Sequence, residues 1–232
     1  MIKEIVKRYS HNTTGRDFVV GDIHGCFELF HSALERVHFN PVTDRCFSVG
    51  DLIDRGPDSK AALSWLAKPW FHACLGNHEE MLLSATNDRG TRSTWIAFMG
   101  GEWWVHTDVA VQTQFREVIE RLPLALEVET AHGFVGIVHA DVPEDMSWPH
   151  FTAALQARDT SACGTALWGR RRAHGIVNTS VSGVDHVICG HTISADRKPH
   201  TVGNVHFIDT GAFLMDGHSK LTLLPLDDLR FK

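Results

Sequence analysis

The stretch FVVGDIHGC, residues 18–26, joins a short apolar run to a pair of polar side chains. The run Phe-Val-Val is typical of a buried strand, because aromatic and β-branched side chains pack well on a pleated surface. Asp22 and His24 follow it, flanked by two glycines. Side chains alternate in direction along an extended chain, so we expect Asp22 and His24 to project together while Ile23 faces the core. The pattern predicts a strand that ends on two ligands for one metal ion.

The same order of residues recurs twice further along the chain. GDLIDRGPDS (50–59) follows the apolar run 46–49, and GNHEEM (76–81) follows the run 70–75. Asp51 comes directly after a strand and a glycine, where its carboxylate oxygens suit a bridge between two ions. Arg55 has the planar donor fork that matches phosphate oxygens. The alternative is that Asp54 and Arg55 form a surface ion pair, which would contribute at most about 1 kcal/mol.

Asn77 and His78 begin the third motif as neighbours, so their side chains must diverge. An amide oxygen is a ligand for a hard metal ion, and an imidazole transfers protons near neutral pH. We therefore expect different roles for the two residues. The alternative is that Asn77 caps a helix and that His78 is exposed.

Two later histidines share the position at a strand end. His139 ends the run 134–138, and His191 follows the run 187–189. Ligands of open α/β sheets bind beyond the carboxyl ends of the strands, so both histidines join the candidate site. The candidate ligands are nitrogen and oxygen donors without thiolates: Asp22, His24, Asp51, Asn77, His139 and His191. Such a set suits manganese, iron, zinc or magnesium, although imidazoles disfavour magnesium alone. Two ions about 3.5–4 Å apart are a common device for the hydrolysis of phosphate esters.

The 232 residues contain no internal repeat, low-complexity tract or linker, which predicts one domain over residues 1–232. Strands are predicted at 18–20, 46–49, 70–75, 134–138, 187–189 and 205–208, and helices at 26–37, from 57 or 58 to before Pro69, at 79–85 and at 113–121. Alternation of strands and helices in the first half predicts an α/β fold with βαβ units, and the strands after Leu122 predict a second sheet packed on the first.

The composition excludes several classes of protein. Hydrophobic residues make up 43% and charged residues 22% of the chain, which is enough for a core, and the net charge of −6 argues against a nucleic-acid partner. No run approaches the roughly 20 apolar residues that cross a bilayer, and the first residues lack the apolar segment of a signal peptide. The five cysteines contain no Cys-x-x-Cys pair, which predicts buried reduced thiols rather than disulfides or a thiolate zinc site. We expect a monomer in the cytoplasm with no membrane partner.

The three motifs, in this order and followed by His139 and Gly190-His191, resemble the signature of the phosphoprotein phosphatase (PPP) family of metallophosphoesterases. FMGGEWW (98–104), LPL (122–124), LWGRRR (167–172) and HFIDTGA (206–212) are similar to the compact bacterial and phage-lambda-type members. The resemblance covers most of the chain. It implies a metallophosphoesterase-type β-sandwich of two mixed sheets flanked by helices.

The resemblance also implies roles for individual residues. Two divalent ions, manganese before iron, zinc or magnesium, would be bound by Asp22, His24 and Asp51 on one side and by Asp51, Asn77, His139 and His191 on the other. It makes His78 the general acid, oriented by Asp54, and it assigns the substrate phosphate to Arg55 and Arg170, with Asn77 beside it. Because Arg171 and Arg172 adjoin Arg170, the assignment among these three arginines stays open.

The hypothesis for function is the removal of phosphate from phosphoserine, phosphothreonine or phosphotyrosine in proteins and peptides. A hydroxide held between the two ions would attack phosphorus directly while His78 protonates the departing oxygen. One alternative is a bis(5′-nucleosyl)-tetraphosphate hydrolase, although such enzymes tend to carry aspartate where Glu79 stands. Another is an inactive phosphopeptide-binding scaffold. Three tryptophans could line a substrate groove, but helix packing is the favoured explanation for them: Trp95, Trp103 and Trp104.

Overall fold

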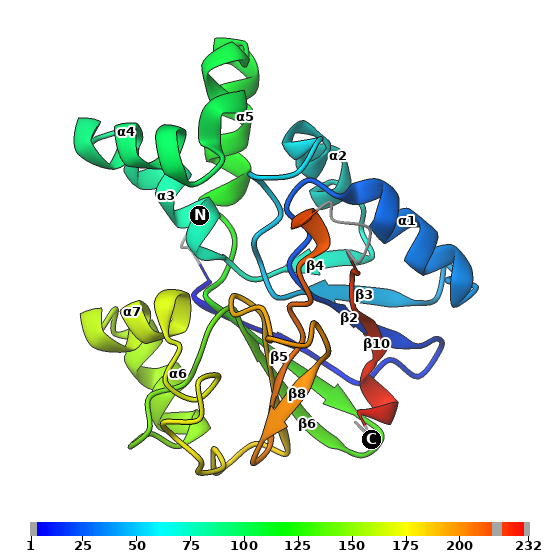
Figure 1. The fold of residues 1–232 in the computed structure, drawn as a ribbon. Coiled ribbons are helices and arrows are strands. Elements are labelled where there is room, and N and C mark those ends of the chain that lie inside the picture. The colour runs from blue at the N-terminus through cyan, green and yellow to red at the C-terminus, as the bar shows by residue number, and fades with distance from the viewer. Residues whose placement is uncertain (1–3, 215–219, 230–232) are drawn as a thin grey trace.

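The computed structural model describes residues 4–214 and 220–229, which form two sheets packed face to face with helices outside them (Figure 1). The smaller sheet has the order β10-β2-β3-β4. Its strands β2, β3 and β4 run parallel, and β10 pairs antiparallel with β2. The bounds are β2 Asp17–Val20, β3 Arg45–Ser48, β4 Phe71–Ala73 and β10 Leu223–Pro225.

The larger sheet is six-stranded and mixed, in the order β1-β5-β6-β7-β9-β8. The pairs β5/β6 and β8/β9 are antiparallel, and the other neighbouring pairs are parallel. The bounds are β1 Val6–Tyr9, β5 Ala125–Thr130, β6 Gly133–Val138, β7 His186–Cys189, β8 His200–Val202 and β9 Val205–Phe207. The α/β sandwich of two mixed sheets predicted from the sequence is thereby confirmed.

Alternation of side chains along the strands builds two apolar layers. Val19 and Phe47 of the small sheet pack against Leu126 and Ile137 of the large sheet, which fills the space between the sheets. The neighbouring residues in the small sheet, such as Phe18, face the other way and belong to the core beneath the helices. Both faces of these strands are therefore buried, which explains why their sequences read as continuous apolar runs.

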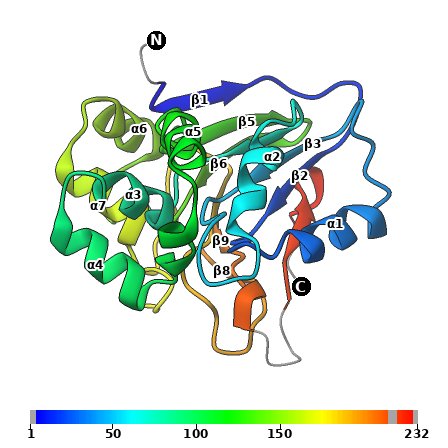
Figure 2. The same ribbon diagram turned by 90° about the horizontal axis from the view of Figure 1, so that it is seen from above.

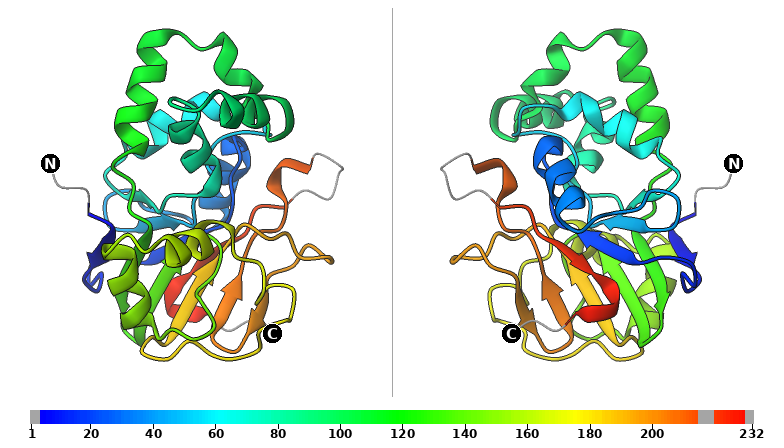
Figure 3. Two further views of the ribbon diagram at one scale, coloured as in Figure 1. Left: turned by 90° about the vertical axis from the view of Figure 1, so that its left-hand side faces the viewer. Right: turned by 90° about the vertical axis from the view of Figure 1, so that its right-hand side faces the viewer.

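The helices cover the two outer sides of the sandwich. Figure 2 shows α1 and α2 on one side and α6 and α7 on the other, while α4 and α5 stand above the sheets in Figure 3. The bounds are α1 Phe27–Arg36, α2 Ala62–Leu66, α3 Asn77–Ser84, α4 Arg89–Phe98, α5 Val109–Ile119, α6 Trp148–Gln156 and α7 Thr160–Trp168. Short 3₁₀ turns occupy Ser59–Ala61, Gly101–His106 (η2), Ala212–Leu214 and Leu226–Asp228.

The predicted elements that the structure contains agree with it to within a few residues. The predicted helix before Pro69 is reduced to the turn Ser59–Ala61 and the five residues of α2. Seven elements of the structure were not predicted: β1, β5, β8, β10, α4, α6 and α7. Strands β8 and β10 are short and only partly buried, so the periodic signal that marks a core strand is absent from them.

One local prediction is wrong. Asp22 and His24 do not continue the strand but lie in the loop after β2, and His24 has a left-handed φ of 45°. Ile23 is fully buried as expected. The turn rather than strand alternation decides how the two polar side chains point.

Two further predictions concern cysteines and membranes. All five cysteines lie within the described ranges, none of them forms a disulfide there, and four of them are buried. No helix in the described part of the chain has the length and apolarity required for a membrane span.

Candidate dinuclear metal centre

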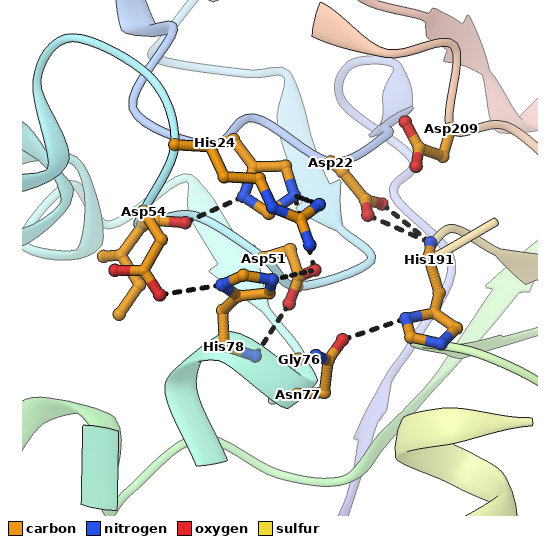
Figure 4. Close-up of polar contacts among 12 residues, drawn as sticks. Asp22, His24, Asp51, Asp54, Gly76, Asn77, His78, His191 and Asp209 are labelled. Carbon is orange, nitrogen blue, oxygen red and sulfur yellow. Dashed lines mark hydrogen bonds and ion pairs between the residues drawn. The ribbon is translucent and has the colours of Figure 1, made fainter. Parts of the chain in front are cut away.

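The predicted ligands meet at the carboxyl ends of strands from both sheets (Figure 4). The loops after β2, β3 and β4 carry the first three motifs, His139 follows β6 directly, and His191 lies just beyond β7. Because the two sheets are packed with these ends adjacent, residues more than 160 positions apart become neighbours: the backbone N–H of His191 donates to the carboxylate of Asp22.

Left-handed backbone conformations are concentrated in these loops. His24, Asp51, Asp54, Arg55 and His191 have φ between 45° and 71°. Each such conformation costs a non-glycine residue of order 1–3 kcal/mol, and it persists only where surrounding contacts hold it. A concentration of such strained residues is typical of a functional site rather than of ordinary turns.

One group of possible ligand atoms comes from Asn77, at the start of α3, and from His139 and His191, in the loops after β6 and β7. Asn77 Oδ1 lies 2.8 Å from His139 Nε2 and 2.9 Å from His191 Nδ1. His139 Nδ1 lies 2.8 Å from the carbonyl oxygen of Val49 and donates its proton there, so Nε2 presents a lone pair to the site. Lone pairs this close repel one another unless a cation lies between them. The arrangement fits a metal ion.

Asp51 connects this group to a second one. Its Oδ1 lies 3.4 Å from His139 Nε2, while its Oδ2 lies 3.5 Å from His24 Nε2 and 3.9 Å from His78 Nε2. His24 Nδ1 is 2.8 Å from the carbonyl oxygen of Ile53, which directs its Nε2 lone pair into the site. The two groups of possible metal ligands are His24-Asp51-His78 and Asp51-His139-His191, and they share Asp51.

Asp22 lies beside these two groups, next to His191. Its carboxylate accepts the N–H of His191 at 3.0 and 3.1 Å, and the pair of groups above does not include it. Burial, with the charges of Asp209 and Asp51, raises the pKa of Asp22 well above its ordinary value. Asp209 is a buried carboxyl that the sequence analysis did not select, and burial raises its pKa to about 6.

The buried carboxylates and neutral imidazoles of the site favour the binding of cations. Burial lowers the pKa of His24 to about 3 and that of His191 to about 2, so both imidazoles are neutral at pH 7 and have lone pairs available. Asp22, Asp51 and Asp209 are each at most 2% exposed. Buried carboxylates beside neutral imidazoles are stabilised by divalent cations, and oxygen and nitrogen donors without thiolates suit manganese, iron or zinc. The residues present therefore fit the two ions.

His78 and Asp54 form a separate buried pair beside Asp51. His78 Nδ1 lies 2.7 Å from Asp54 Oδ2, and both side chains are fully buried. Burial opposes protonation of His78, but the charges of Asp51 and Asp54 outweigh it and raise its pKa. Within the described ranges, His78 Nε2 has no hydrogen-bond partner. The pair is thus an oriented imidazole with one nitrogen directed at the site.

Two arginines lie at the rim. Arg55 is exposed, donates from Nη1 to His24 Nε2 at 3.2 Å, and stacks its guanidinium 4.8 Å from the ring centre of Phe213. Arg170 donates to Thr192 Oγ1 at 3.1 Å and to the carbonyl oxygen of His191 at 3.3 Å. Each therefore lies beside a candidate metal ligand.

The other two arginines of the triplet point elsewhere. Arg172 is fully buried and pairs with Asp141 at 3.1 Å, and Arg171 forms an exposed pair with Glu144 at 3.5 Å. Of the three adjacent arginines, Arg170 is the one that contacts His191.

Glu79 was missed as a residue that shapes the site. Its Oε2 accepts from the backbone N–H of Asp51 at 2.8 Å and of Gly76 at 3.0 Å, and its Oε1 accepts from Leu52 at 2.8 Å and Ile53 at 3.3 Å. Gly76, not Asn77, occupies the N-cap of α3. A glutamate in the first turn of a predicted helix was the available signal, because such a carboxylate, here at the third position of α3, reaches back to backbone donors at the start of the helix.

Trp95 and Trp103 were also missed as site residues. They are packed as expected, and they donate in addition from Nε1 to Asp54 at 2.5 and 2.6 Å. A buried indole N–H needs an acceptor, and a buried aspartate needs donors. Hydrogen bonds between these tryptophans and a buried aspartate could therefore have been expected from the sequence.

Comparison with known proteins agrees with this geometry. The family model of the calcineurin-like phosphoesterases matches residues 18–195, and the chain belongs to that family of metallophosphoesterases. Its resemblance to the phosphoprotein phosphatases is confirmed by serine/threonine-protein phosphatase 1 of Salmonella typhimurium, which is 37% identical over 215 residues, or 90% of this chain and 93% of the relative. The protein is accordingly a hydrolase enzyme.

Two other similarities are to dinucleotide tetraphosphatases. A symmetrical bis(5′-nucleosyl)-tetraphosphatase of Pseudomonas entomophila is 44% identical over 70 residues, which is 29% of this chain and 25% of that protein. The solved structure of a provisionally assigned diadenosine tetraphosphatase has a TM-score of 0.61 at 19% identity and covers 95% of this chain and 97% of its own. At this identity, the second similarity shows only that the two proteins share a fold.

Proposed function

We propose that the protein hydrolyses phosphate monoesters of serine and threonine side chains in proteins. The observation that carries the proposal is the His78–Asp54 pair, which directs an oriented imidazole nitrogen toward the candidate metal ligands. An oxygen leaving phosphorus must gain a proton, and His78 is the group positioned to supply it. Asp54 accepts the N–H of His78 Nδ1 and favours the imidazolium form, in which Nε2 carries the proton to be donated.

The rest of the site supports the same reaction. Arg55 and Arg170 flank the candidate ligands from opposite loops and would bind the phosphoryl oxygens, with Asn77 beside them. Asp22, His24, Asp51, Asn77, His139 and His191 would hold two divalent ions, for which we propose manganese. Bound there, such ions supply positive charge to the phosphoryl group and lower the pKa of water to about 7.

The extent of similarity supports a protein substrate over a dinucleotide. The Salmonella phosphatase is similar over nearly its whole length, whereas the Pseudomonas tetraphosphatase is similar over a quarter of its own. Tetraphosphate hydrolysis remains the second candidate, because that local match is 44% identical.

The test is to strip the protein of metal, reconstitute it with manganese, and compare phosphate release from a phosphoserine peptide with cleavage of diadenosine tetraphosphate. Manganese-dependent release from the peptide with the dinucleotide spared is the expected result. The reverse preference would move the function to nucleotide metabolism. Tight binding of the phosphopeptide without release, at full metal occupancy, would instead indicate an inactive scaffold.

A further inference from the structure

The Asp54 carboxylate accepts three side-chain N–H groups. Oδ2 is 2.7 Å from His78 Nδ1 and 2.5 Å from Trp95 Nε1, and Oδ1 is 2.6 Å from Trp103 Nε1. The carboxylate is fully buried. Water therefore does not compete for its oxygens, and the two indoles account for the donors that a buried carboxylate needs besides His78.

Both tryptophans reach Asp54 from distant parts of the chain. Trp95 lies on α4, 41 residues after Asp54, and Trp103 lies on η2, 49 residues after it. Trp95 is fully buried, and Trp103 is only partly covered. Asp54 is thus held by residues of α4 and η2, which lie outside its own loop.

Two glycines allow this approach. Gly100 has φ 88°, and a Cβ there would lie 2.5 Å from the backbone nitrogen of Arg55. A Cβ on Gly101 would lie 2.6 Å from the indole of Trp95. A side chain at either position would push η2 away from the Asp54–Arg55 loop. The motif FMGGEWW therefore brings Trp103 close to Asp54.

An aromatic cluster fixes the indoles in turn. Trp103 packs 5.2 Å from the ring of Phe115 on α5, and Trp104 packs 5.8 Å from Trp95 and 5.9 Å from Phe115, all between ring centres. Trp104 belongs to this cluster, but none of the hydrogen bonds found for the described residues joins its side chain to Asp54. Trp104 thus shares the packing of Trp95 and Trp103 but not their hydrogen bond to Asp54.

The indoles add orientation without adding charge. A carboxylate bound by His78 alone could rotate about its Cβ–Cγ bond, whereas donors on both oxygens hold its plane and aim Oδ2 at His78 Nδ1. An arginine in the same place would neutralise Asp54 and weaken its hold on the imidazole. A neutral indole leaves the full carboxylate charge facing His78.

We propose that Trp95 and Trp103 are positioning residues that hold Asp54, and through it His78, in the geometry for protonating the leaving group. This inference rests on the proposed function, because it takes His78 as the proton donor. It predicts that loss of either indole N–H slows the hydrolysis of esters with a strongly basic leaving oxygen more than that of esters with a weakly basic one.

The experiment measures kcat of the manganese-loaded enzyme on phenyl phosphate, whose leaving oxygen is strongly basic, and on p-nitrophenyl phosphate, whose leaving oxygen is weakly basic. The variants are Trp95→Phe and Trp103→Phe, with Trp104→Phe as the matched control and His78→Asn as the reference. We expect each of the first two to lose about tenfold or more on phenyl phosphate, which is part of the roughly 10²–10⁴-fold that a general acid contributes, and much less on p-nitrophenyl phosphate. Trp104→Phe should change both rates by the same factor.

A second variant separates the N–H group from the ring. Benzothienylalanine at position 103 keeps the bicyclic shape of tryptophan and replaces N–H by sulfur, so selective loss there cannot come from a cavity. Equal losses on both substrates, or losses no more selective than those of Trp104→Phe, would overturn the inference while His78→Asn remains selective. If His78→Asn itself lost both activities equally, the proton-donor role would fail, and the inference with it.

Discussion

Glu79 accepts the backbone N–H of Asp51 at 2.8 Å, although 28 residues separate them. The same carboxylate accepts the N–H of Gly76, Leu52 and Ile53. One buried side chain therefore joins the loop that carries Asp51 to the start of the helix that carries Asn77 and His78. The position of Asp51 relative to His78 therefore depends on the hydrogen bonds of Glu79.

Glu79→Gln should destabilise the fold and loosen the site. All the backbone partners of Glu79 are donors, so the amide group of glutamine would place N–H against N–H and leave a buried polar group unsatisfied, at a cost of about 1–3 kcal/mol. Urea unfolding measures this cost. Glu80→Gln is the control, because the Glu80 side chain is only partly buried and accepts from the hydroxyl of Ser84, which an amide oxygen can also do; it should stay within about 0.5 kcal/mol of the parent.

His78→Asn should keep both metal ions and lose most turnover on phosphoserine, by about 10²–10⁴-fold. The imidazole lies 3.9 Å from Asp51 Oδ2, so a role as a ligand is the competing explanation. Elemental analysis of the manganese-loaded variant separates the two: full occupancy with slow turnover supports proton donation, and loss of one ion assigns His78 to the metal.

Asp51→Asn should lower the occupancy of both ions as well as the rate, because each oxygen of Asp51 faces a different group of ligands. Manganese should also raise the melting temperature of the parent enzyme, since an ion that binds only the folded state adds about 2.7 kcal/mol at one hundred times its Kd. We expect that shift to shrink in the variant. Asp159→Asn, which alters only the cap of α7, should retain it. Unchanged occupancy in Asp51→Asn would refute the bridge.

The three adjacent arginines should respond differently to alanine. Arg170→Ala should raise KM for the phosphopeptide with little change in stability, because its contacts are with Thr192 and the backbone of His191 at the rim. Arg172→Ala should destabilise the protein by about 3–5 kcal/mol, because it leaves the buried Asp141 without its partner. Arg171→Ala should be nearly neutral, since its pair with Glu144 is exposed. Urea unfolding and steady-state kinetics on all three variants check the ranking.

Much of the fold could be predicted from local pattern. The buried strands β2, β3, β6, β7 and β9 have both faces in apolar surroundings, so their sequences are apolar throughout. Strand β1 could not be recognised in this way, because its VKRY sequence carries two charged residues and only Val6 is buried. Helix α4 contains a glycine and five polar residues before Trp95, and tertiary packing around Trp95 overrides its weak propensity.

The sequence by itself determined which atoms are available for the site. Each of the three motifs, and each later histidine, stands where a buried strand ends, and such ends gather at one edge of a sheet whatever the loops do. Only the tertiary structure decided which partner each side chain took. Trp95 and Trp103 reach Asp54, Arg170 rather than Arg172 reaches His191, and Asp22 takes the N–H of His191. These contacts join residues from 21 to 169 positions apart, and nothing in the local sequence encodes the packing that closes such distances.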